Sequence, residues 1–193
     1  MKVIAVQYLN VKRDNSFILS EDKKFDRCAL IELTKLELTK SGVKVIDFSY
    51  HKKQFYLLIE YKNEIISFDL LLKNVTGAGW VDKPGIKRCQ VCNIKKEQPE
   101  SLGVVANKHY NLILGYYNFD SNPILIAWDP YRYLEHRTIR SCYVTVDALK
   151  RGYEKGFYEG VVSSQKCWIF LGNYFDRFLD NYIGYILKFY LKG

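Results

Sequence analysis

The sequence predicts a mainly β fold with helices, of the α+β class, on three observations. Many short segments rich in β-branched and aromatic residues are separated by turn residues. Two segments, 146–153 and 174–191, have the apolar spacing of helices. The composition, with 48% hydrophobic and 26% charged residues, is that of a globular chain and excludes wholesale disorder. Together these features predict a β-barrel or sandwich with helices packed against it.

The first part of the chain has the pattern of strands joined by short polar turns. A first strand is expected at 3–9, and an antiparallel meander at 43–48, 54–61 and 64–72. Segment 28–38 fits a helix and a strand equally well. A glycine-bearing loop at 77–79 then marks the clearest internal boundary.

The second part continues the alternation of strands and turns. Further strands are expected at 87–94, 109–118, 123–128, 141–146 and 166–171. The helix at 146–153 would take Asp147 as its N-cap, and an amphipathic helix would close the chain. At 193 residues, one domain spanning 1–193 is the default. The alternative division is an N-terminal subdomain at 1–76 and a core at 77–193.

The formal charge of +8 favours a polyanionic partner, and its distribution is informative. Basic and acidic side chains number 13 and 10 in residues 1–78, 9 and 6 in 79–140, and 7 and 5 in 141–193. Because no tail or block holds the excess, the fold itself must assemble any anion site.

The ends and the cysteines indicate a cytoplasmic protein. The apolar run at 3–6 is too short for a signal peptide, and charges interrupt the closing helix, which excludes a membrane span. Five cysteines, an odd number, favour reduced thiols. Cys89 and Cys92 form a C-x-x-C pair, but no second Cys/His pair completes a zinc site, so no metal or other cofactor is expected.

Two segments combine aromatic rings with cations. Segment 79–88 holds one Trp and three cations in a turn-rich context, and segment 128–140 mixes Arg, Tyr and His between two expected strands. Such loops can bind phosphates while a ring or guanidinium reaches a base. The alternative is that each is a solvated loop with an aromatic anchor.

A wider set of motifs adds a family resemblance over residues 79–183. The motifs are Trp80 with Lys83-Pro84-Gly85 and Lys87-Arg88-Cys89-Gln90-Val91, then Ile113-Leu114-Gly115-Tyr116-Tyr117, Ile126-Ala127-Trp128-Asp129, Ser141-Cys142-Tyr143-Val144 and the closing 170–183 block. This order resembles DNA target-recognition domains of bacterial restriction systems. Such domains precede nuclease or McrB-type motor regions, as in LlaJI-like systems, and some stand beside methylases.

These domains resemble the B-three pseudobarrel of plant transcription factors and of the EcoRII-like effector domain. The resemblance implies a seven-stranded β-pseudobarrel with flanking helices and an N-terminal elaboration, whose two arms grip double-stranded DNA in the major groove. It also implies a nuclease or motor partner. The DNA-binding residues it implies are Trp80, Lys83, Lys87 and Arg88 on one arm, and Arg132, Tyr133, His136, Arg137 and Arg140 on the other. The pattern departs at Cys89 and Cys92, where aliphatic strand residues are expected.

Three alternatives stay open at this point. Asp47, Glu60 and Lys62 could form a PD-(D/E)xK-like nuclease site, in which two carboxylates hold Mg²⁺. A reader of methylated cytosine could flip the base between aromatic rings, with Trp80, Tyr131 and Tyr133 as candidates. An interaction protein with no salt-dependent DNA affinity is the third.

Overall fold

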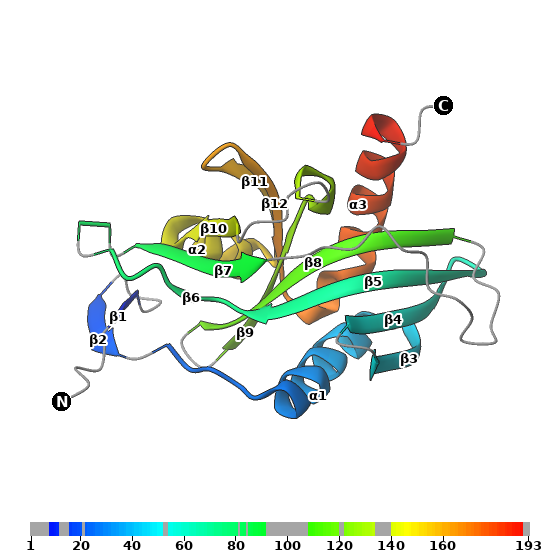
Figure 1. Ribbon diagram of the computed structural model, residues 1–193, viewed down its shortest axis with the longest axis horizontal. Helices are drawn as coiled ribbons and strands as arrows, with labels where there is room; N and C mark the ends of the chain where they lie inside the picture. Colours follow the sequence, from blue (N-terminus) through cyan, green and yellow to red (C-terminus); the bar gives the residue numbers. More distant parts are fainter. Residues whose placement is uncertain are drawn as a thin grey trace.

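The computed structural model describes residues 8–11, 16–20, 22–51, 54–80, 82–83, 85–91, 108–119, 122–133 and 140–190. Over these residues the prediction of a β-rich α+β fold is confirmed: three sheets are combined with three α-helices. Figure 1 shows a long sheet through the molecule, with a smaller sheet gathered toward one end.

The large sheet has seven strands in the order β11-β12-β9-β8-β5-β4-β3. Their bounds are β3 Lys44–His51, β4 Gln54–Tyr61, β5 Glu64–Asn74, β8 Lys108–Phe119, β9 Asn122–Trp128, β11 Phe157–Val162 and β12 Gln165–Phe170. All neighbours are antiparallel except β5 and β8, which are parallel. The sheet is open, with β11 and β3 at its edges, so the expected pseudobarrel is corrected to an open mixed sheet.

Two smaller sheets accompany it. A three-stranded sheet has the order β10-β7-β6, with β6 at Thr76–Gly77, β7 at Ile86–Val91 and β10 at Arg140–Thr145. A two-stranded sheet pairs β1, Tyr8–Val11, with β2, Phe17–Ser20.

The helices settle the ambiguous segment and correct one cap. Segment 28–38 is helical: α1 spans Arg27–Leu38, with the Asp26 side chain accepting from the Ala29 amide. Helix α2 spans Val146–Lys155, and its N-cap is Thr145 rather than Asp147. Asp147 lies in the first helical turn, where its charge suits the positive end of the helix dipole. Helix α3 spans Phe175–Phe189, and short 3₁₀ turns lie at Thr39–Ser41 (η1), Pro130–Arg132 (η2) and Gly172–Tyr174 (η3).

Most other predicted strands are confirmed, including the antiparallel meander β3-β4-β5. The sequence interpretation missed β11, whose Glu159 and Gly160 hide the strand pattern. Residues 3–7 and 92–94 of two expected strands lie outside the described residues. Because β5 pairs with β8, one sheet spans residue 76, the suggested subdomain boundary.

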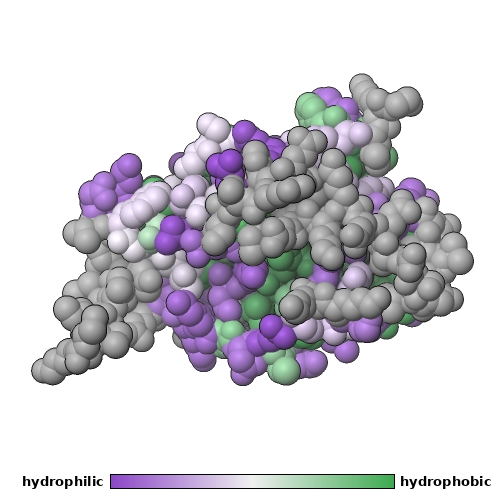
Figure 2. All heavy atoms as spheres, viewed as in Figure 1, coloured by the Kyte–Doolittle hydropathy of each residue, from purple (hydrophilic) through white to green (hydrophobic). Residues whose placement is uncertain are grey.

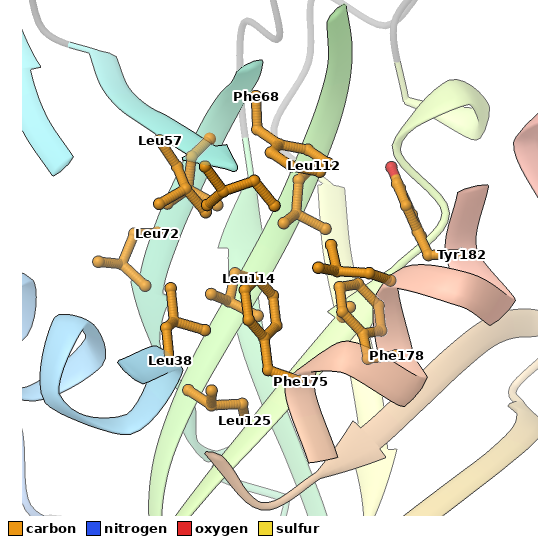
Figure 3. Packing of buried hydrophobic residues seen from close by; sticks show 14 of the residues in the cluster. Leu38, Leu57, Phe68, Leu72, Leu112, Leu114, Leu125, Phe175, Phe178 and Tyr182 are labelled. Carbon is orange, nitrogen blue, oxygen red and sulfur yellow. The ribbon is translucent and has the colours of Figure 1, made fainter. Parts of the chain in front are cut away.

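Strand alternation builds a separate hydrophobic core on each side of the large sheet. On one side, α1 and α3 pack against residues such as Leu112, Leu114 and Phe170. Figure 3 shows Phe175 and Phe178 of α3 among the leucines of the sheet. On the other side, β7, β10 and α2 pack against Ile113, Ile126 and Ile169 among others. The second core fixes the three-stranded sheet in place.

Candidate nucleic-acid interface

The three-stranded sheet presents one face to the core and the other outward. On β7, Lys87, Cys89 and Val91 are buried, whereas Ile86, Arg88 and Gln90 are partly or fully exposed. On β10, Cys142 and Val144 are buried, so Ser141 and Tyr143 lie on the outward side. Register places Arg88 opposite Tyr143 and Gln90 opposite Ser141. We call the set Trp80, Lys83, Arg88, Gln90, Ser141 and Tyr143 the outer face.

Two rings and a cation from different segments meet on the outer face. Trp80, which is 38% exposed, lies in the loop between β6 and β7. Its ring centroid is 5.4 Å from that of Tyr143, and the Lys83 ammonium is 5.8 Å from the Trp80 ring. The region over β6 and β7 is mostly purple to near-white in Figure 2, which marks it as hydrophilic to intermediate. Base stacking and phosphate binding both suit such a surface.

Two side chains bond to the backbone of Tyr143. Gln165 of β12 accepts from the Tyr143 amide at 2.8 Å and donates to the Ser141 carbonyl at 2.9 Å. Trp128 Nε1 donates to the Tyr143 carbonyl at 3.0 Å. A Cβ on Gly115 would lie 2.8 Å from the Trp128 ring, so this glycine makes room for it. These contacts fix β10, and therefore the outer face, to the large sheet.

Lys87 lies in the interior and not on the outer face. Its side chain is fully buried, and its ammonium is 2.9 Å from both carboxylate oxygens of Asp22. Asp22 also accepts from the Gly77 amide at 2.5 Å and the Tyr117 hydroxyl at 3.3 Å. Burial lowers the pKa of Lys87, while Asp22 acts in the opposite direction. The pair ties the segment before α1 to β6 and β7.

The residues expected on the second arm are dispersed. Arg132 is exposed and donates to the Ser164 carbonyl in the turn between β11 and β12. Tyr133 is 7% exposed, and burial raises the pKa of its hydroxyl. Arg140 is exposed at the start of β10. His136 and Arg137 lie outside the described residues.

The three rings proposed as a base-flipping pocket are not brought together. Trp80 contacts Tyr143, Tyr131 stacks on Tyr190 at 4.5 Å, and Tyr133 belongs to the core beneath the three-stranded sheet. Each ring has a different set of neighbours, so they do not line one pocket.

Each of the proposed nuclease residues is engaged with a different partner. Glu60 pairs with Lys44 at 2.6 Å, and Lys62 pairs with Asp180 of α3 at 2.6 Å. Asp47 accepts from the Ser49 hydroxyl at 2.8 Å. Within the described ranges, no group of three His, Cys, Asp or Glu residues could hold a metal ion.

The cysteines of the described part are free thiols. Cys89 lies directly opposite Cys142 across β7 and β10, and both are buried. A hydrogen bond with Cys142 and burial together raise the pKa of the Cys89 thiol, which keeps it protonated. Cys92 lies outside the described residues.

A family model, "Methylase-associated X1", matches residues 66–178, which is more than half of the 193-residue chain. The chain belongs to the methylase-associated X1 family. The matched segment of this family member runs from β5 into α3 and contains the whole outer face. The family points to a restriction–modification context, which agrees with the restriction-system setting that the sequence resemblance implies. No curated protein and no solved structure shows significant similarity to this family member.

Among the helices of the described residues, none is long and apolar enough to cross a membrane.

Sequence reasoning missed the residues that complete and support the outer face. Gln90 and Tyr143 alternate with buried residues on strands, which was the available signal. Gln165 and Asp22 act across 22 to 65 positions of the sequence, and no local pattern indicates such pairs.

Proposed function

We propose that this protein is a double-stranded DNA-recognition module of a restriction–modification system and binds DNA through the outer face. The observation that carries the proposal is the meeting of Trp80, Lys83, Arg88 and Tyr143 on one supported surface within the family-matched segment. Cations supply phosphate attraction, and the sheet supplies groups that can reach base edges.

In this proposal DNA cleavage or motor activity belongs to a partner chain or domain. The different engagements of the three candidate nuclease residues support that division: Glu60 pairs with Lys44, Lys62 pairs with Asp180, and Asp47 accepts from Ser49. Arg132 and Arg140 extend the cationic surface beyond the outer face, and Arg137 remains a predicted DNA contact.

The test is a fluorescence-anisotropy titration of a duplex selected from random DNA, repeated at several salt concentrations. We expect affinity to fall steeply with salt. Arg88→Ala should weaken specific binding by about 1–3 kcal/mol if Arg88 contacts a base. Lys35→Ala is the matched control: it removes one exposed positive charge from α1, on the opposite side of the large sheet.

Equal losses in Arg88→Ala and Lys35→Ala would contradict a role for the outer face. Salt-independent or undetectable binding of the parent protein would contradict DNA recognition itself. Titrating the same duplex with methylated cytosines determines whether the module senses modification.

A further inference from the structure

Arg88 and Gln90 occupy the centre of the outer face. They lie two positions apart on β7, the middle strand, so both side chains project to the same side. In the part of the chain that the structure describes, neither the Arg88 guanidinium nor the Gln90 amide takes part in a hydrogen bond or an ion pair. Their donors and acceptors therefore remain available to an external partner.

Resting on the proposed DNA recognition, we propose that β7 and β10 enter the major groove as an antiparallel ribbon, with Arg88 reading guanine and Gln90 reading adenine. The major groove, about 12 Å wide, admits a two-stranded ribbon. Strand β6 pairs with β7 only at Lys87 and Arg88, so β7 and β10 continue from Cys89 to Val91 as a ribbon of two strands. Arginine can donate two hydrogen bonds to O6 and N7 of guanine, and glutamine can pair with N6 and N7 of adenine.

The spacing of the two side chains fits neighbouring bases. Residues two apart on a strand are about 6.8 Å apart, whereas base pairs rise by about 3.4 Å. A strand that follows the groove would therefore place the two side chains over base pairs one or two steps apart. The expected site contains a guanine and an adenine at that separation.

The remaining residues of the outer face fit the border of such a contact. Tyr143 is the cross-strand partner of Arg88, and its ring packs against that of Trp80. Lys83 lies in the loop beyond the strand, next to Trp80, where it would meet the phosphate backbone. The cation at this position would add affinity but no base preference.

The experiment is selection from a random duplex library with the full chain and with Arg88→Ala, Gln90→Ala and Lys83→Ala. Arg88→Ala should lose the guanine preference and keep the adenine preference, and Gln90→Ala should do the reverse. Each loss should be roughly tenfold in relative affinity for the preferred base. Lys83→Ala should weaken all sequences alike. Circular dichroism and thermal unfolding verify that each variant is folded.

The outcomes separate this inference from the proposed function. Specific binding whose base preferences are unchanged in both Arg88→Ala and Gln90→Ala overturns the ribbon readout and leaves DNA recognition standing. Preferred sites without a guanine and an adenine one or two steps apart also overturn the readout. Absence of salt-dependent binding by the parent chain overturns both proposals.

Discussion

The two sides of the seven-stranded sheet are built differently. On the side of α1 and α3, large rings fill the interior: Phe170 and Phe178 stack at 4.5 Å, and Tyr182 packs against both Phe178 and Trp168. On the side of the three-stranded sheet, apolar packing is combined with a buried ion pair between Asp22 and Lys87. Side chains bond to strand backbones on both sides: Gln165 and Trp128 bond to β10, and on the side of α1 and α3 the Tyr182 hydroxyl donates to the Asn111 carbonyl.

This difference suggests separate roles. The ring-packed side of α1 and α3 supplies most of the stability, and the side of the three-stranded sheet orients the outer face. The free energy gained by burying rings is roughly proportional to the apolar area removed from water, and it is non-directional. A buried ion pair and backbone hydrogen bonds have directional geometry, so they fix β7 and β10 in one register and orientation. The buried ion pair and the Gln165 and Trp128 hydrogen bonds hold the strands that carry the outer face, where orientation matters most for recognition.

The largest effect is expected on the ring-packed side. Phe178→Ala should lower the free energy of unfolding by about 4 kcal/mol, because it removes a fully buried ring and leaves a cavity. Urea unfolding followed by fluorescence measures the loss. Phe189→Ala is the control on the same helix: its ring is 58% exposed, and a change below about 0.5 kcal/mol is expected. Similar losses in the two variants would contradict the described packing.

The second effect is expected at the ion pair. Asp22→Ala should lower the free energy of unfolding by about 3 kcal/mol, because the buried Lys87 ammonium loses its carboxylate partner. In the same urea assay, the double variant Asp22→Leu with Lys87→Met should lose less than Asp22→Ala alone. A single variant as stable as the parent would show that this side does not depend on the pair.

The sequence predicted the parts of the fold whose cause is local. Alternation at 54–61 and 64–72 predicted the antiparallel meander, and the spacing of Phe175, Phe178 and Tyr182 predicted the closing helix. The open form of the sheet was not predictable, because the parallel pairing of β5 with β8 joins segments about 40 positions apart. Residue spacing carries no information about such pairing.

In the candidate site too, local patterns predicted some residues correctly and could not predict a contact between distant parts of the chain. Trp80, Lys83 and Arg88 were predicted as residues of a segment that combines rings with cations, and all three belong to the outer face. Lys87 was grouped with them because it is a cation in the same segment. The strand period sends it inward, to a carboxylate 65 positions away that no local pattern reveals.

The smallest effect is expected from the contact that supports the outer face. Gln165→Ala removes both hydrogen bonds to β10 and should cost about 1 kcal/mol, since the residue is only partly buried. Hydrogen exchange at the Tyr143 amide should accelerate, because its acceptor is lost. Gln165→Glu keeps an acceptor for that amide but loses the donor to Ser141, so it should restore slow exchange at Tyr143. Parent-like exchange in Gln165→Ala would show that the Gln165 bond does not protect this amide, and that the Trp128 bond and the pairing with β7 suffice to position β10.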